Sequence, residues 1–247
     1  MGRKSQSTGW QHHVATRTRA LLGRRGPLRN RTYRAKHGLD RTLESLLDVR
    51  RGGYFVELGA NDGLRQSNTY FLEKRYGWSG VLIEPALNNY LKLLRNRSPN
   101  NVFFCTACVA FDYPEPFVRL RYADLMSVTA SVETDLPDIN LHVERTRLAR
   151  ADRRTAVEFA APAAPLSQLL DRAEAPTVID LLSIDVEGAE LEVLRGVDHE
   201  RHRFKHLLVE SRDLDRMEGF LAGVDYRMSV QLSHHDFLFV NERSPAA

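Results

Sequence analysis

Hydrophobic and polar positions along the chain alternate between two periods, one typical of helices and one typical of buried strands. Leucines three or four residues apart over residues 39–49 predict an entry helix, which ends at a pair of glycines. The next apolar run, 54–58, has the length of a buried strand, and a glycine-bearing turn leads from it into a helix expected over 68–76. The chain therefore begins its folded part as helix, strand, turn and helix.

This alternation continues towards the C-terminus. Further strands are expected at 81–83, 102–104, 178–184, 206–209, 226–232 and 237–240, and further helices at 88–95, 166–170, 189–195 and 214–221. Strands that alternate with helices favour parallel pairing with right-handed crossovers. The last two strands are separated by a short polar stretch, which predicts a hairpin. We therefore predict a Rossmann-like α/β fold with a mostly parallel central sheet, helices on both faces and a C-terminal antiparallel hairpin.

The pattern weakens between about residues 112 and 165, where five prolines and the polar stretch 144–154 interrupt it. We interpret this region as an inserted lid or substrate segment, and its Ala- and Pro-rich end, 160–165, as a linker. A chain of 247 residues can bury one substantial core. The predicted organisation is a flexible leader over 1–38 followed by one domain over 39–247.

Charge adds a feature at the N-terminus. Residues 1–38 hold ten Lys and Arg side chains and no Asp or Glu, whereas the remainder holds 25 basic and 32 acidic side chains. The leader is expected to be a solvated extension, with contact to an anionic membrane surface as the alternative. Nucleic acid is a less favoured partner, because the leader has few aromatic residues and no known nucleic-acid signature.

The apolar stretches and the cysteines bear on location. No run approaches the roughly 20 apolar residues needed to span a bilayer, and the early stretch 20–22 is too short for a signal-peptide core. We expect a cytoplasmic protein, with peripheral membrane contact as the alternative. Cys105 and Cys108 have the spacing of a redox pair, but their flanks predict strands, so we expect buried structural thiols.

Candidate chemistry lies where the strands end, because open α/β sheets bind ligands beyond the carboxyl ends of their strands. After the first strand, Gly59 and Gly63 let the backbone approach a ligand, and Asn61 tolerates a left-handed conformation. The three-glycine dinucleotide fingerprint is absent. Glu57, within the strand, can pair with the amino group of S-adenosylmethionine, whereas it would repel a pyrophosphate.

Glu84 ends the second strand, 21 residues after Gly63. An acidic side chain at this place can accept hydrogen bonds from both ribose hydroxyls of an adenine nucleoside. The position alone does not separate NAD from S-adenosylmethionine, and the turn chemistry favours the latter. An ordinary strand-end charge facing solvent is the simpler alternative for Glu84.

A third cluster follows the most hydrophobic strand, where Asp185 and Glu187 lie two residues apart. Residues at this spacing on extended backbone face the same way, so both can enter a cleft. They can orient an acceptor hydroxyl, remove its proton, or hold a divalent metal such as Mg²⁺. Alternatively, Glu187 or Glu190 complements the macrodipole of the helix that follows.

These segments together resemble the FkbM-type methyltransferases, which use S-adenosylmethionine. The matching blocks are 55–63, 77–85, 184–190 with 194–196, and 208–210, and the likeness covers about residues 52–240. The resemblance implies a class I methyltransferase fold and O-methylation, commonly of a sugar hydroxyl in a glycan, glycolipid or secondary metabolite. It also implies that the first turn and Glu84 bind the cofactor and that Asp185 lies at the reaction centre. No block of the insertion aligns, so the acceptor site stays open.

The strand ends and the resemblance define the expected site. Residues expected at the cofactor are Glu57, Gly59, Ala60, Asn61, Asp62, Gly63, Ser67, Asn68, Glu84, Pro85 and Asp185. Ser67 or Asn68 is also expected to cap the following helix. Asp185 is the leading candidate for the base, with Glu187 beside it, and His235 or His142 is the alternative. Glu210 can join Asp185 around a metal, whose presence the sequence leaves open.

Three rival functions remain beside an O-methyltransferase. An NAD-dependent oxidoreductase requires the pyrophosphate turn that is missing here. A non-catalytic binding module would keep the cofactor fold and dock through its basic leader. A nucleic-acid methyltransferase would usually carry an Asn- or Asp-Pro-Pro-aromatic block where Asp-Val-Glu-Gly stands at 185–188.

Overall fold

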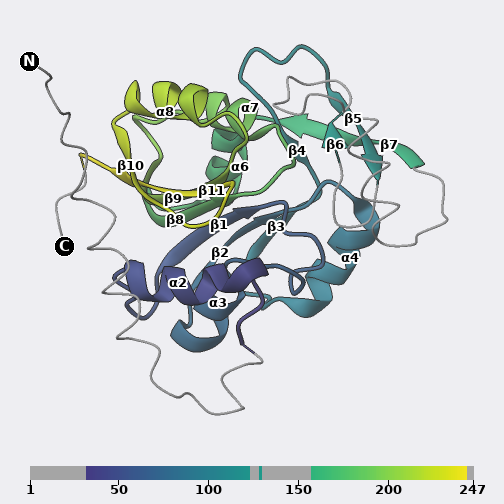
Figure 1. Cartoon of the computed structure of the whole chain (residues 1–247). Coiled ribbons are helices and arrows are strands. Elements are labelled where there is room, and N and C mark those ends of the chain that lie inside the picture. The colour runs from purple at the N-terminus through teal and green to yellow at the C-terminus, as the bar shows by residue number, and fades with distance from the viewer. Residues whose placement is uncertain (1–31, 123–127, 130–156, 244–247) are drawn as a thin grey trace, which may run out of the picture. The chain divides into compact units, whose positions relative to one another are not determined.

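The computed structural model describes residues 32–122, 128–129 and 157–243 (Figure 1). Within them, seven strands form one sheet in the order β10-β11-β9-β8-β1-β2-β3. These strands are β1 (Tyr54–Leu58), β2 (Ser79–Ile83), β3 (Val102–Phe104), β8 (Val178–Ile184), β9 (Arg203–Glu210), β10 (Tyr226–Gln231) and β11 (Asp236–Asn241). All neighbours pair in parallel except β11, which is antiparallel to both β9 and β10. The predicted Rossmann-like α/β fold, with a mostly parallel central sheet and a C-terminal antiparallel hairpin, is confirmed.

Helices cover both faces of this sheet (Figure 1). After a short 3-10 turn, η2 (Lys36–Gly38), one face carries α2 (Leu39–Leu46), α3 (Tyr70–Tyr76) and α4 (Leu87–Asn96), and the other carries α6 (Leu166–Arg172), α7 (Glu190–Arg195) and α8 (Leu214–Ala222). Successive side chains of β1 point to opposite faces, so Phe55 packs with leucines of α2–α4 and Val56 with those of α6–α8. Strands covered on both faces must be apolar throughout, which is why β1 and β8 are nearly continuous hydrophobic runs.

The order in which strands are added to the sheet reverses at β1. Strands β2 and β3 lie on one side of β1, whereas β8 and β9 lie on the other. The strand ends are in register, because Leu58 pairs with both Ile83 and Ile184. Residues that follow β1, β2 and β8 therefore meet at one edge, which is the topological switch point where open α/β sheets bind ligands.

A smaller sheet corrects one prediction. Strands β4 (Ala107–Cys108), β5 (Phe117–Tyr122), β6 (Val128–Thr129) and β7 (Val157–Ala164) pair in the order β4-β7-β5-β6. The interpretation of 160–165 as a linker is wrong, because residues 160–164 belong to β7, where 160–162 pair with β5 and 163–164 pair with β4. Pro162 lies opposite Phe117 near the end of that ladder, where the loss of one N–H donor is tolerated. The small side chain of Ala161 is buried against Leu120 in a separate core.

Some expectations concern residues outside this description. His142 and most of the basic leader lie beyond the described residues. Within the described ranges, none of the helices has both the length and the apolar character required to cross a membrane.

Candidate active site

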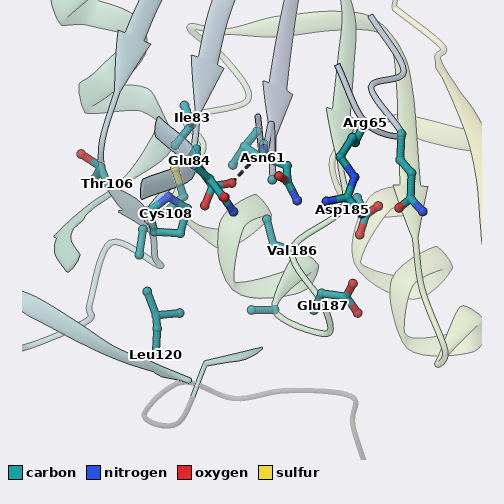
Figure 2. Close-up of a pocket in the computed structure, with 17 residues that line it drawn as sticks. Asn61, Arg65, Ile83, Glu84, Thr106, Cys108, Leu120, Asp185, Val186 and Glu187 are labelled. Atoms are coloured by element: carbon teal, nitrogen blue, oxygen red, sulfur yellow. Dashed lines mark hydrogen bonds between the residues drawn. The ribbon is translucent and has the colours of Figure 1, made fainter. Parts of the chain in front are cut away.

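A pocket opens at the switch point, beyond the carboxyl ends of four strands (Figure 2). Gly59 and Asn61 follow β1, Glu84 follows β2, Thr106 follows β3 and Asp185 follows β8, and all of them line the pocket. The space, including its open mouth, is about 840 Å³. The pocket lies where the strand ends predict a ligand site.

Glu84 lies where β2 meets the pocket, and only 5% of its surface is exposed. Its Oε2 accepts the N–H of Asn61 at 2.8 Å, shown as a dashed line in Figure 2, and its Oε1 accepts the N–H of Ala86 at 2.9 Å. Burial raises the pKa of Glu84 to about 7, although these two N–H groups lower it. Each oxygen keeps a further lone pair, so Glu84 can also accept hydrogen bonds from a diol.

Asp185, Glu187 and Glu210 form an acidic cluster, of which Asp185 and Glu187 line the pocket. One carboxylate oxygen of each lies within 4.8 Å of the others. Burial, followed by the charges of Glu187 and Glu210, holds the pKa of Asp185 well above its usual value. A carboxylate whose pKa is raised is a stronger base than a solvated one, so Asp185 can accept a proton from a substrate.

The positive charge of Arg212 offsets part of the negative charge of this cluster. Its Nη2 lies 3.5 Å from an oxygen of Glu187 and 3.5 Å from an oxygen of Glu210. Carboxylate oxygens are also the ligand type that Mg²⁺ prefers. Asp185, Glu187 and Glu210 are therefore the residues that could hold such an ion, beside a guanidinium that offsets part of their charge.

The loop after β8 brings Asp185 and Glu187 together by a route that differs from the expected one. Strand β8 ends at Ile184, and Glu187 has a left-handed backbone with φ of 57°, so the two acids do not lie on extended chain. Glu190 holds this loop, because its Oε1 accepts the N–H groups of Val186 at 3.0 Å and Gly188 at 3.1 Å. Glu190 is thus a structural residue at the start of α7, as the alternative interpretation predicts.

Comparison with known families decides the class of protein. The profile of the methyltransferase FkbM domain matches residues 57–236. The chain belongs to the FkbM methyltransferase family. No curated protein matches this FkbM chain.

Solved structures similar to this FkbM chain are remote in sequence. They include a methyltransferase FkbM from Methylobacillus flagellatus KT, with 15% identity and a TM-score of 0.49 over 79% of this chain and 45% of that one. TrmK of M. capricolum, in complex with S-adenosyl-homocysteine, shows 9% identity and a TM-score of 0.45, over 84% of this chain and 69% of that one. A precorrin-6y C5,15-methyltransferase from Geobacter metallireducens GS-15 shows 10% identity and a TM-score of 0.44, over 85% of this chain and 90% of that one. The chain thus spans less than half the length of the first of these.

The predicted cofactor residues of the FkbM domain fall into two groups. Those that line the pocket are Gly59, Asn61, Glu84, Pro85 and Asp185. Those that lie outside its lining are Glu57, Ala60, Asp62, Gly63, Ser67 and Asn68. The second group supports the turn and the start of α3 from within the protein.

Glu57 is the main correction in the second group. Its Oε2 lies 3.1 Å from Nη1 of Arg97, whose side chain has no exposed surface. The hydroxyls of Ser67 and Thr69 donate to the same oxygen at 3.0 and 2.6 Å, and the N–H of Asn68 donates to Oε1 at 2.9 Å. Both oxygens therefore serve the protein's own donors, and the structure does not place Glu57 at the cofactor.

The other members of this group also have structural partners. Asp62 Oδ1 accepts the N–H groups of Leu64 and Arg65 at 2.9 and 2.8 Å, which tightens the turn. Ser67 Oγ accepts the N–H of Tyr70 at 3.1 Å, which satisfies the first residue of α3. The N-cap of this helix is Thr69, whose side chain makes no capping bond, so the prediction that Ser67 or Asn68 occupies that position is wrong. The remaining members are enclosed by protein. Ala60 lies in the core beneath α2–α4, and Asn68 Nδ2 donates a hydrogen bond to Ser183 Oγ. A carbon added to Gly63 would meet side chains of α4 and of the residue after it.

Two further predictions are corrected at the site. His235 lies in the bend before β11, where its carbonyl accepts the N–H of Ser211 at 2.8 Å, and it is not among the pocket-lining residues. Cys105 and Cys108 are partly exposed free thiols rather than fully buried ones, and Cys108 lines the pocket. Desolvation raises the pKa of both thiols, which keeps them protonated.

Sequence reasoning missed several lining residues. They include Arg65, Gln66, Asn89, Thr106, Cys108 and Leu120. Thr106 comes shortly after β3, so the strand-end rule applied to the third strand would have found it. Leu120 lies on β5, in the region where no local pattern indicated a strand, and only the folded structure brings it to the pocket.

Proposed function

We propose that this FkbM domain is an S-adenosylmethionine-dependent O-methyltransferase that acts on a hydroxyl, in particular a sugar hydroxyl of a glycan, glycolipid or secondary metabolite. The observation that carries the proposal is that a single pocket contains both Glu84 and Asp185. Glu84 suits the ribose diol of a nucleoside cofactor, and Asp185 suits the proton of an acceptor hydroxyl.

The donor and acceptor groups of the lining fit the cofactor. Ile83, Cys108 and Leu120 offer an apolar wall beside Glu84, which suits an adenine ring, and Glu84 would hold the ribose. Arg65 and Gln66 offer donors for the carboxylate of the amino-acid part. When bound, S-adenosylmethionine supplies a methyl group on a positively charged sulfur, a charge that the nearby carboxylates favour.

Asp185 would accept the proton that the hydroxyl loses. Methyl transfer to a hydroxyl breaks a carbon–sulfur bond, forms a carbon–oxygen bond and releases one proton, so a neutral hydroxyl needs a base as the methyl moves. The raised pKa of Asp185 makes its ionised form a stronger base than a solvated carboxylate. Arg212, next to Glu187 and Glu210, would keep the cluster together when Asp185 is ionised.

A sugar acceptor is supported by the charge of the rim. Carboxylates accept hydrogen bonds from hydroxyls, so an acidic cluster at the reaction centre suits a polyol. The same cluster would repel the phosphates of a nucleic acid, which argues against that acceptor.

The test combines binding with turnover on the full chain. Calorimetry with S-adenosylmethionine and S-adenosylhomocysteine should show one site, and labelled methyl groups should appear on glycans or glycolipids as an ether. Binding without transfer to any hydroxyl acceptor would favour a non-catalytic module, and transfer to nucleic acid would favour that rival. The proposal is overturned if neither compound binds.

A further inference from the structure

Helix α4 carries an apolar stripe that the site does not use. Leu87, Leu91 and Leu94 follow the i, i+4, i+7 spacing of one helix side, and they are 60%, 48% and 42% exposed. Leu93, on the other side of the helix, is fully buried in the core. Single exposed leucines are ordinary, but three on one side of a ten-residue helix form a contiguous patch that indicates an interaction surface.

Basic side chains accompany this stripe. Lys92 and Arg95 are exposed on the same helix, between the stripe and the core side. No Asp or Glu occurs anywhere from residue 85 to residue 111. A short helix with leucines on one side and only Lys and Arg beside them has the composition of an interfacial membrane helix.

We propose that α4, at the lower right of Figure 1, docks this domain on an anionic lipid surface. Leu87, Leu91 and Leu94 enter the boundary between headgroups and acyl chains, while Lys92 and Arg95 contact anionic headgroups. The leucines and the basic side chains both strengthen this binding, because the burial of apolar side chains and the attraction to anionic lipid add together.

Other occupants of the stripe fit less well. In a symmetric pair of chains, α4 would bring Lys92 and Arg95 close to their own copies, with no acid on the helix to offset the repulsion. Three half-exposed leucines also supply only part of the roughly 800 Å² per partner that a stable interface buries. Residues 1–38 are themselves basic, so their charge opposes contact with Lys92 and Arg95 and adds to the attraction for an anionic bilayer.

Docking through α4 would hold the pocket near the lipid surface. The helix begins three residues after Glu84, and Asn89 on its first turn lines the pocket. A hydroxyl acceptor carried on a lipid would then lie close to the site. The docking itself does not depend on the proposed reaction, because a vesicle assay measures binding alone.

The experiment measures binding of the full chain to vesicles of phosphatidylcholine alone and of phosphatidylcholine mixed with phosphatidylglycerol. The test variant carries Leu87→Ser, Leu91→Ser and Leu94→Ser. A matched control replaces three exposed apolar residues of other elements: Leu46→Ser, Val178→Ser and Met228→Ser, which are 44%, 43% and 37% exposed in the wild type. Circular dichroism and thermal unfolding confirm that all proteins are folded.

We expect the wild type to bind the mixed vesicles and the test variant to lose at least about tenfold in partition coefficient, because each leucine removes several inserted CH₂ groups. The control should stay within about twofold of the wild type. Replacing Lys92 and Arg95 by Gln should weaken binding to the mixed vesicles only and reduce its salt dependence.

Three results would overturn the proposal. The first is that the wild type does not bind the mixed vesicles. The second is that the triple leucine variant binds them as tightly as the wild type, which would leave the basic leader as the attachment. The third is that sedimentation shows a dimer of the wild type that is absent in the triple variant while vesicle binding persists, which would assign the stripe to a second copy of the chain.

Discussion

A carbon atom added to Gly59 would lie 1.9 Å from the backbone carbonyl oxygen of Asp185. Gly59 follows β1 with a φ of 71°, and the N–H of Asp185 donates to the carbonyl of Leu58 at 3.4 Å. The ends of β1 and β8 thus pass so close that only glycine fits between them. The same contact sets the position of the turn that opens the pocket and of the acid at its centre.

The first prediction concerns this contact. Gly59→Ala should lower the free energy of unfolding by about 2–4 kcal/mol, because the added carbon collides with backbone and the left-handed conformation disfavours alanine. Urea unfolding measures the loss. Gly219→Ala is the control, since a carbon added there in α8 meets no atom within 4 Å; it should be neutral or add up to about 1 kcal/mol. Equal stability of Gly59→Ala and the wild type would contradict the steric argument.

Glu84 should make stability depend on pH. Its pKa rises from 4.5 in the unfolded chain to about 7 in the fold, so the folded state holds a proton more tightly. The resulting stabilisation is complete below about pH 4.5 and is lost as the pH rises through 7, by about 3 kcal/mol. Glu84→Gln should remove this dependence in unfolding measurements between pH 4.5 and 8. Parallel curves for the two proteins would show that Glu84 does not titrate in this range.

Asp185 should be required for turnover and not for binding. Asp185→Asn keeps the shape of the side chain but cannot accept a proton, so methyl transfer should fall by about 10²–10⁴-fold. The dissociation constant of S-adenosylhomocysteine, measured by calorimetry, should change little. Asp171→Asn, at a half-exposed position on α6, provides the control. Undiminished turnover in Asp185→Asn would remove this residue from the role of base.

Glu210 should help to raise the pKa of Asp185. The charge of Glu210 and its hydrogen bond are among the causes that raise the pKa of Asp185. In Glu210→Gln, the pKa of Asp185 should therefore fall, and the acid limb of the pH–rate profile should move to lower pH. The exposed Glu200→Gln should leave the profile in place. A limb that stays where it is in the wild type would mean that another group controls it.

Arg97 should be the most important buried cation of the fold. Its side chain is fully buried and pairs with Glu57 at 3.1 Å and Glu73 at 2.7 Å. Arg97→Met leaves Glu57 without its cation and Glu73 with only Lys74, whose side chain is 39% exposed. This loss should cost about 3–5 kcal/mol in urea unfolding. Arg243→Met breaks ion pairs at a side chain that is 46% exposed, and its loss should be much smaller because water screens exposed ion pairs. Similar losses in the two variants would contradict the role of burial.

Local pattern was sufficient for the large sheet and insufficient for the small one. The apolar runs of β1 and β8 are readable because strands covered on both faces must be hydrophobic throughout. The β7 segment around Pro162 carries alanines and a proline, whose intrinsic preference is not for strands. Its pairing with β5 supplies the hydrogen bonds that decide its conformation, and these come from residues about 40 positions away.

The sequence by itself determined the order of the strands and helices of the large sheet, the edge at which polar side chains gather, and the presence of Glu84 and Asp185 at that edge, because strand ends follow directly from periodicity. The tertiary structure alone decided which acids serve the pocket. Glu57 lies in β1 and Glu84 directly follows β2, and these strands end at the same edge. Arg97 nevertheless binds Glu57, whereas Glu84 lines the pocket. The environment of a buried charge depends on partners distant in the chain, and no local pattern records them.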